Sequence, residues 1–447
     1  MDFTRSYDVL GGMMPSSRWD QHFAPLLRRP VITTLLAAAG PIPCHLVGGV
    51  LRDFLLHRPS RDLDVIVERD GRGVAETIAT ELGARLVLLG GDRFAAFRIV
   101  AKELVLDLWD RQQQSLAADL ARRDFTINSF ALDLQHPQVV DPYSGLDDLA
   151  SHRLRATTEL SFTGDPLRVL RLARIGGQLA GFTVVRRTLE LALRAVPQLE
   201  SVAPERIREE LRILLSHEGG DESFKLLEQL GVYPTLWTGR SPASRESTAA
   251  STRLDRFSRS SRWLEQMAPE SPFRQDPFTG RMAVLFDTAS RAQRRNRVDL
   301  LQEFQSAGFI SKRDARRTER LLRWQDLPLK EGPQRWLLHE MGELWPALVC
   351  FLGTRGEEPL DEGQWRRVVT DLVRLATERG HEIFAPTPLL SGTEIQELLD
   401  IPPGPRVGEI ASKLRRRQIE GGMSSRGAAE RTVLDLGSAS ADPGSED

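Results

Sequence analysis

Two aspartates, Asp62 and Asp64, lie one residue apart in the segment RDLDVIVE at residues 61–68. Apolar residues alternate with polar ones there, which predicts a strand whose pleat directs both carboxylates to one face. Two carboxylates this close repel each other unless a cation lies between them. Mg²⁺ prefers such oxygen ligands and leaves positions open for substrate phosphates. Asp107, in a second strand-like run, could supply a third carboxylate. The pattern predicts a magnesium site, although an Asp-x-Asp pair by itself is also typical of a solvated strand edge.

A glycine pair precedes these aspartates in the segment HLVGGVLRD. Gly48 and Gly49 fall between a predicted strand and a predicted helix, where backbone N–H groups and the helix N-terminus can approach a triphosphate. Arg52 adds a fixed positive charge one turn into that helix. A tight turn without a ligand would also explain the glycines. Together with the aspartates, within 17 residues, the pair favours a nucleotide site.

A second polar cluster interrupts the apolar segment RRDFTINSFALD at residues 122–133. Arg123, Asp124 and Asn128 could hydrogen-bond a ribose and a phosphate together. In the alternative interpretation, Asp124 caps the following helix and the arginines face water.

The third cluster is GDPLRVLRLAR at residues 164–174, where Asp165 and the proline after it are typical of a helix N-cap and first helical position. Three arginines then recur at intervals of three residues: Arg168, Arg171 and Arg174. Asp165 and Arg168 could present an acceptor beside a donor fork. That pair matches the amine and ring nitrogen of cytosine or adenine, whereas guanine and uracil carry a carbonyl in place of the amine. A capped helix with an exposed arginine stripe would show the same spacing.

Taken in chain order, these segments resemble the class II tRNA nucleotidyltransferase and bacterial poly(A) polymerase family. The resemblance covers five ordered motifs and a tail segment: GGVLRD with RDLDV, RRDFTIN, DPYSGLDDL, GDPLRVLRLAR, PERIREEL and PLLSGTEIQELLDIPPGPRVGEI. One position departs from the family pattern, because the base-reading motif usually opens with two acids and here begins with Gly164.

The resemblance implies a role for each matching residue. Asp62 and Asp64 would bind two Mg²⁺ ions, and Asp107 would help to activate the primer 3′-hydroxyl for in-line attack on the α-phosphorus, with pyrophosphate leaving. The remaining residues would bind the nucleotide: the triphosphate by Gly48, Gly49 and Arg52, the ribose region by Arg123, Asp124 and Asn128, and the base or phosphates by Asp165, Arg168, Arg171 and Arg174.

The implied function is template-independent addition of C, A or both from CTP and ATP to the 3′ end of tRNA. Subtypes of the family add CCA, CC or A, and a CC- or A-adding enzyme would depend on a partner nucleotidyltransferase. The alternatives are a poly(A) polymerase and a catalytically inactive RNA-binding protein. A short acidic C-terminus favours the tRNA enzymes over poly(A) polymerases, and KLRRR at residues 413–417 is either an RNA contact or a solvated helix face.

The strands and helices expected around these residues indicate an α+β fold. Short strands are expected at residues 42–49 and 61–68 and in RLVLL, FAAFRIV and ELVLDLWD, with a helix near residues 73–82. From about residue 165 apolar spacing near 3.6 takes over, which predicts a helical neck, body and tail. The expected parts are an N-terminal extension at 1–30, a nucleotidyltransferase head at 31–150, a helical neck at 151–235, a flexible linker or loop at 236–255, a tRNA-binding body and tail at 256–436, and a disordered tail at 437–447.

Composition restricts the class of protein that this chain can be. The chain has 447 residues, 40% hydrophobic and 27% charged, and 60 basic against 62 acidic side chains give a net charge of −2 that indicates no partner. Only five of the basic residues are lysines, an excess of arginine that suits phosphate binding and that a GC-rich genome would also produce. Cys44 and Cys350 cannot form a disulfide framework or a zinc knuckle. With no apolar run long enough for a membrane helix, we expect a cytoplasmic protein without membrane contact.

Overall fold

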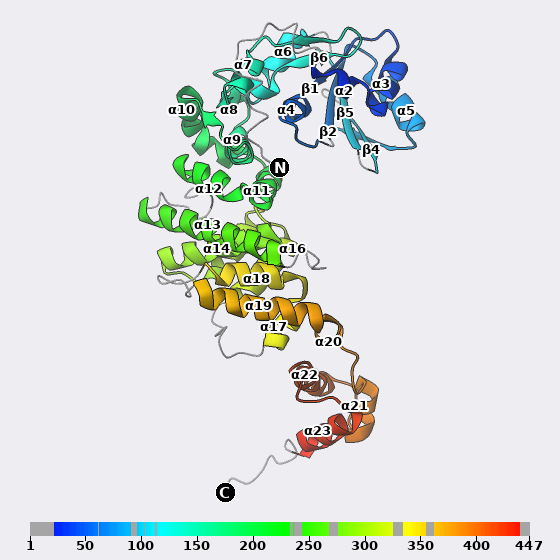
Figure 1. The fold of residues 1–447 in the computed structure, drawn as a ribbon, viewed down its shortest axis with the longest axis vertical. Helices are drawn as coiled ribbons and strands as arrows, with labels where there is room; N and C mark the ends of the chain where they lie inside the picture. Colours follow the sequence, from blue (N-terminus) through cyan, green and yellow to red (C-terminus); the bar gives the residue numbers. More distant parts are fainter. Residues whose placement is uncertain are drawn as a thin grey trace. The chain divides into compact units, whose positions relative to one another are not determined.

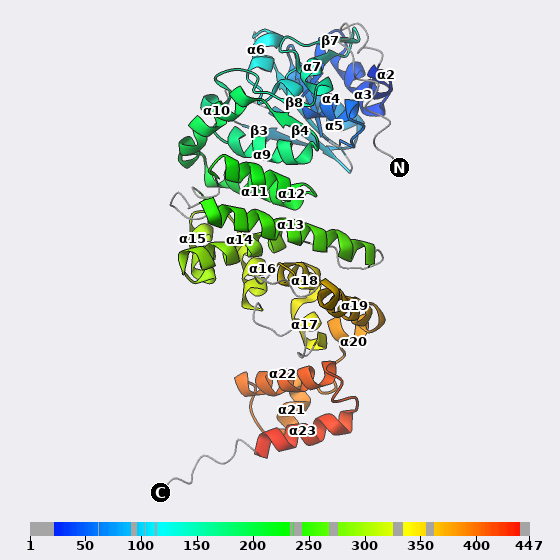
Figure 2. The same ribbon diagram turned by 60° about the vertical axis from the view of Figure 1, so that its left-hand side comes forward.

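The computed structural model describes residues 22–60, 62–90, 96–102, 104–111, 114–232, 236, 244–267, 276–324, 334–354 and 362–438. It divides into two compact units. The first comprises Met1–Arg206 with Gln229–Val232, and the second comprises Ile207–Glu228 with Tyr233–Asp447. Figure 1 shows that the first unit contains the large sheet, whereas Figure 2 shows that the second is built from helices. The division at Arg206 falls inside the neck predicted at residues 151–235.

A mixed seven-stranded sheet forms the centre of the first unit, with strand order β3-β4-β5-β2-β1-β6-β7. Its strands are β1 (Cys44–Val47), β2 (Asp62–Val67), β3 (Arg85–Leu89), β4 (Ala96–Ala101), β5 (Leu104–Asp110), β6 (Ala131–Asp133) and β7 (Gln138–Val140). The strands predicted from alternation in this part of the sequence are confirmed. β2 and β5 are parallel neighbours, whereas β4 pairs with β5 in the antiparallel sense.

Helices pack against this sheet on the side where β2 presents its apolar residues. The helices at the start of the chain are α2 (Ala24–Leu27), α3 (Pro30–Ala39), α4 (Gly49–Leu55) and α5 (Gly71–Glu81). α5 contacts β3, β4, β5 and α3 (Figure 1). Leu63, Val65 and Val67 are fully buried on this side, and because side chains alternate along a strand, Asp62 and Asp64 point to the opposite face. Phe23 is also fully buried and stacks on Phe54, which places residues 22–30 with the head and not in a separate extension.

The rest of the first unit is mostly helical. It contains α6 (Leu116–Ala121), the 3₁₀ turn η3 (Thr126–Asn128), α7 (Gly145–Ala150), α8 (Ser161–Gly164), α9 (Arg168–Gln178), α10 (Arg186–Ala195) and η4 (Val196–Ser201). One feature corrects the prediction of an all-helical neck: β9 (Thr183–Val184) pairs in parallel with β8 (Arg153–Leu154). Two residues are too few to produce a recognisable alternation in the sequence.

From Pro204 onward every described element is helical. The elements are α11 (Pro204–Ser216), α12 (Gly220–Gln229), α13 (Ser244–Met267), α14 (Pro277–Gln293), α15 (Arg297–Ser306), α16 (Lys312–Arg323), α17 (Gln334–Met341), η6 (Gly342–Leu344), α18 (Trp345–Leu352), α19 (Glu362–Glu378), α20 (Gly380–Phe384), α21 (Gly392–Leu399), α22 (Pro405–Ile419) and α23 (Arg426–Ser438).

The linker predicted at residues 236–255 was wrong over its second half, because α13 begins at Ser244. Ala250, Leu254 and Phe257 are fully buried at helical spacing. Arg253 between them forms an ion pair with the buried Asp287 at 2.8 Å. The composition of this stretch is typical of a loop, but its buried apolar residues fall on one helical face, and packing of that face stabilises the helix. Residues 237–243 lie outside the described part.

The last three helices share a hydrophobic core of their own, which includes Ile395, Ile410 and Val433. α23 extends to Ser438, so the tail predicted as disordered from residue 437 begins in a helix, and residues 439–447 lie outside the described part. Arg416 of α22 lies over the ring of Trp336, 5.6 Å from its centroid. Among the described residues, no helix is long and apolar enough to cross a membrane.

Candidate active site

A cleft of about 830 Å³ opens on the face of the sheet that carries the aspartates. Every predicted site residue except Asp165 lines it. Eight arginines and five aspartates contribute to its wall, so the cleft is strongly polar with an excess of positive charge. Such a surface suits a ligand that carries several negative charges, as a nucleoside triphosphate does.

The carboxylates form a row across adjacent strands. Asp64 on β2 is directly opposite Asp107 on β5, and Asp107 is directly opposite Arg98 on β4. Arg98 donates from Nε to Asp107 Oδ1 at 2.8 Å and from Nη2 to Oδ2 at 2.7 Å. Burial raises the pKa of Asp64; the charge of Arg123 opposes this shift, and the charges of Asp107 and Asp62 add to it. The predicted convergence of the three aspartates is therefore observed, whereas Arg98 was not anticipated from the sequence.

The glycine turn lies directly over Asp64. Gly48 has φ 84° and ψ −157°, a backbone conformation that only glycine adopts without strain. A Cβ atom at this position would lie 2.5 Å from Asp64 Oδ2 and 3.0 Å from Arg123 Nη1. Gly49 begins α4, and a Cβ there would lie 3.2 Å from Arg52 Nη2. The absence of side chains keeps the space above the carboxylate open.

Arg52 is held in place from two sides. Its Nη1 donates to Asn128 Oδ1 at 2.8 Å, and its Nε and Nη2 donate to the two carboxylate oxygens of Asp53 at 2.9 and 3.0 Å. The residue is only 8% exposed. Its guanidinium therefore joins α4 to the η3 turn at a fixed position in the cleft wall.

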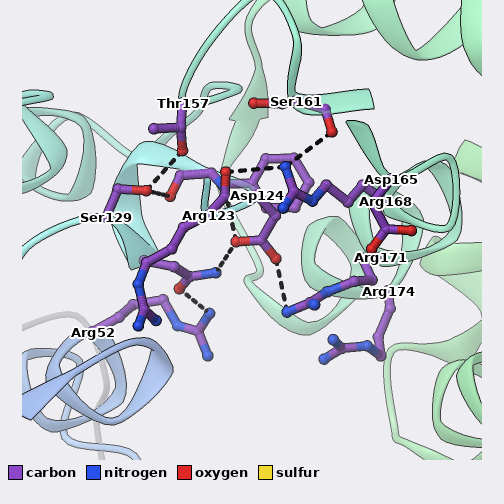
Figure 3. A network of polar contacts seen from close by, with 12 residues as sticks. Arg52, Arg123, Asp124, Ser129, Thr157, Ser161, Asp165, Arg168, Arg171 and Arg174 are labelled. Atoms are coloured by element: carbon purple, nitrogen blue, oxygen red, sulfur yellow. Dashed lines mark hydrogen bonds and ion pairs between the residues drawn. The ribbon is translucent and has the colours of Figure 1, made fainter. Parts of the chain in front are cut away.

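Asp124 is the centre of the second cluster, as Figure 3 shows. Its Oδ1 accepts from the Phe125 N–H at 2.8 Å and from Asn128 Nδ2 at 2.9 Å. Its Oδ2 lies 2.9 Å from Arg171 Nη2 of α9 (Figure 3). Burial would raise the pKa of Asp124, but the charge of Arg171 and the two hydrogen bonds outweigh burial and lower it. The carboxylate thus stays ionised and connects the two predicted nucleotide-binding motifs.

Arg123 is positioned by residues that the sequence did not single out. Its guanidinium lies 5.6 Å from the ring centroid of Trp109, and its Nη2 lies 3.5 Å from Asp119 Oδ2. α6 carries Asp119 and is anchored by Leu120, which packs with β-strand residues in a small buried cluster. Trp109 lies two residues beyond Asp107 on β5, so both side chains project from the same face. This same-face spacing was a usable signal, whereas the role of Asp119 depends on the tertiary packing.

Asp165 and Arg168 were predicted to present an acceptor beside a donor fork, and in this structure other groups bind each of them. Asp165 precedes α9, which begins at Arg168, and its extended backbone with φ −152° is typical of the predicted N-cap position. Asp165 accepts from Arg206 Nη2 at 2.9 Å and from the Leu167 N–H at 3.3 Å. Arg168 donates to the carbonyl oxygens of Ser161 at 2.9 Å, of Arg123 at 3.3 Å, and of Arg122.

The donor set fits a hard divalent cation in part. Asp62 and Asp64 project from one face of β2, and Gly48 leaves room over Asp64 that a Cβ would fill. Two carboxylates with open positions suit Mg²⁺, which usually retains water and binds substrate phosphates as well. In the described part of the chain, however, no three acidic, cysteine or histidine side chains form a preassembled metal site. The third carboxylate of the row, Asp107, is instead bound by Arg98.

Two families match the chain: "Poly A polymerase head domain" over residues 44–155, and "Probable RNA and SrmB-binding site of polymerase A" over residues 181–237. The CC-adding tRNA nucleotidyltransferase of Geobacter sulfurreducens is 30% identical, over 91% of this chain and 94% of the relative. The A-adding tRNA nucleotidyltransferase of Deinococcus radiodurans is 29% identical, over 85% and 92% respectively.

Solved structures share the fold. A CCA-adding enzyme in complex with ATP has a TM-score of 0.68 at 20% identity, covering 96% of this chain and 98% of that one. The Thermotoga maritima CCA-adding enzyme in complex with tRNA has a TM-score of 0.61 at 20% identity, covering 98% of each chain.

Proposed function

The chain belongs to the class II tRNA nucleotidyltransferase family, and we propose that it adds C, A or both, from CTP and ATP, to the 3′ end of tRNA. One observation carries the proposal. Asp62, Asp64 and Asp107 gather beneath the open Gly48 turn, in a cleft whose other charged side chains are mostly arginines. Carboxylates for a divalent cation beside arginines for phosphates are the components that nucleotidyl transfer requires. An enzyme with tRNA as its substrate would act in the cytoplasm.

In this proposal Asp62 and Asp64 hold Mg²⁺. The cation, when bound, supplies charge stabilisation at the phosphate oxygens during transfer. Asp107 accepts a hydrogen bond from the primer 3′-hydroxyl and orients it toward the α-phosphorus. The open space over Gly48, together with the first N–H groups of α4, receives the triphosphate.

The other predicted residues bind the nucleotide. Arg52 and Arg123 present positive charge to the phosphates from fixed positions, which avoids reorganisation during the reaction. Asp124 and Asn128, which hydrogen-bond to each other, fix the part of the cleft wall that faces the ribose. Arg168, Arg171 and Arg174 lie together on α9 and line the cleft, and we place the base beside them. Asp165 takes part only if Arg206 releases it.

The test is incorporation of each single NTP, with Mg²⁺, into tRNA transcripts that end before CCA, after the first C, and after CC. Use of CTP and then ATP on the shortest transcript would identify a complete CCA enzyme. ATP use confined to the CC-ending transcript, or CTP use without ATP, would identify an A-adding or CC-adding enzyme that requires a partner. The curated relatives include both specialised kinds.

Two controls make this test decisive. An unrelated RNA of similar length should be a poor primer, and its efficient extension with ATP would instead favour a poly(A) polymerase. Asp62→Ala/Asp64→Ala should abolish incorporation, whereas Glu68→Gln should retain it, because Glu68 follows β2 outside the cleft and pairs with Arg111. Absence of incorporation in the wild type would overturn the proposal in favour of an inactive RNA-binding protein.

A further inference from the structure

Arg98 holds Asp107 from the β4 side of β5, whereas Asp64 lies on the β2 side. It is opposite Asp107 in the antiparallel β4–β5 register, and both oxygens of Asp107 accept from its guanidinium at 2.7 and 2.8 Å. Arg98 also lines the cleft, whereas its neighbours Phe97 and Ile99 are buried on the opposite face. With both oxygens bound by the guanidinium, the carboxylate of Asp107 faces β4 and must turn before both oxygens can face a cation held by Asp62 and Asp64.

The two arginines closest to the carboxylate row differ in how firmly they are held. The side chain of Arg123 is 14% exposed and is held by Asp119 and by the ring of Trp109. The side chain of Arg98 is 43% exposed, and within the described part of the chain its guanidinium donates to Asp107 alone. Arg98 is therefore held at one place and is reached by water, whereas Arg123 is held at two. Arg98 is thus the one that can move.

We propose that Arg98 is a positioning residue that competes with the divalent cation for Asp107. Without a cation, its charge offsets the repulsion among the carboxylates and keeps Asp107 in the row. When a cation binds, Arg98 releases Asp107, so that the third carboxylate becomes available only in the loaded site. The inference rests on the proposed function, since it assumes that Asp62 and Asp64 hold the cation.

The test is Mn²⁺ binding to the full chain, without nucleotide or RNA, followed by the electron paramagnetic resonance signal of free Mn²⁺. Arg98→Met should tighten Mn²⁺ binding by about three- to fivefold, the equivalent of one exposed ion pair. Arg98→Lys retains the charge but lacks the fork and should give a smaller increase. Arg58→Met is the matched control, because Arg58 lines the same cleft but donates to the Gln178 carbonyl oxygen and not to the row.

A double-mutant cycle separates competition at Asp107 from a through-space effect of charge. In an Asp107→Asn background, Arg98→Met should no longer tighten Mn²⁺ binding. An equal increase in that background, an equal increase in Arg58→Met, or no increase in Arg98→Met would each overturn the inference. Circular dichroism establishes that the variants are folded, and Arg98→Lys preserves the test if the methionine variant is not.

The outcomes also distinguish this inference from the proposed function. Wild-type protein that incorporates nucleotides and binds Mn²⁺, but whose affinity is unchanged by Arg98→Met, refutes the role of Arg98 alone. Wild-type protein that neither binds Mn²⁺ nor incorporates nucleotides refutes both.

Discussion

Gly48→Ala should disable the site while leaving the fold largely intact. Gly48 has φ 84° and ψ −157°, a region essentially confined to glycine, so alanine there costs about 1–3 kcal/mol in backbone strain. The added Cβ would also lie 2.5 Å from Asp64 Oδ2, against 3.4 Å for the start of ordinary contact. Asp64 must therefore shift by most of an ångström or the turn must open.

A displacement of about 1 Å at reacting groups can cost roughly 100-fold in rate. We therefore expect kcat for nucleotide incorporation to fall by about two orders of magnitude. The free energy of unfolding, measured by urea titration, should fall by about 1–3 kcal/mol. Mn²⁺ binding should weaken as well, because Asp64 is displaced from its position beside Asp62.

Gly40→Ala is the matched control for backbone strain. Gly40 also has a positive φ, 56°, but a Cβ there would meet nothing within 4 Å. This variant should lose stability without losing kcat. A Gly48→Ala enzyme with near wild-type kcat, or a Gly40→Ala enzyme with an equal loss of kcat, would refute the reasoning from the Gly48–Asp64 contact.

Three further predictions follow from the rest of the chain. Burial raises the pKa of the Cys44 thiol to about 11 and raises that of Cys350 as well, so neither should react with a thiol reagent at pH 8 until the protein is unfolded. The folded-state pKa of Asp124 is lowered, so its stabilising contribution is present above the unfolded value of about 3.9 and is lost as pH falls through the folded value. Asp124→Asn should reduce the free energy of unfolding at pH 7 by roughly 1–3 kcal/mol and weaken its acid dependence, measured by urea titration across pH. Replacing Arg415 and Arg417 by Ala should weaken tRNA binding and reduce its salt dependence by roughly one unit of slope per lost phosphate contact, without changing affinity for free CTP, and unchanged tRNA affinity would remove both residues from the RNA surface.

The sequence predicted the head of this protein well because its signals are local. Alternation along β2 identifies the face that carries Asp62 and Asp64, since a side chain's face depends only on position along its own strand. The strand that pairs with β2 cannot be identified in the same way. The register that places Asp107 beside Asp64 joins segments distant in the chain, and no local pattern encodes it. Arg98 and Asp107, in contrast, pair within the hairpin of β4 and β5, so their proximity was a usable local signal that the sequence analysis did not take up.

The errors have equally specific causes. The helix α13 was mistaken for a linker because its serines and threonines dominate the composition, whereas burial of Leu254 and Phe257 determines the structure. Asp165 was predicted as a helix N-cap because Asp-Pro is typical of a helix start, and its hydrogen bond from the Leu167 N–H fits that role. The contact of its carboxylate with Arg206 depends on tertiary packing, for which the sequence has no local signal.

The excess of arginine over lysine can now be judged at individual sites. Composition alone cannot separate a GC-rich genome from a need for phosphate binding. Arg52, however, donates to both Asp53 and Asn128, and Arg98 donates to both oxygens of Asp107. A lysine ammonium is a point charge without a planar fork, so it cannot reproduce either arrangement. Arginine is therefore required by geometry at these two positions, whatever the origin of the bias elsewhere, and Arg52→Lys should lower nucleotide incorporation although the charge is retained.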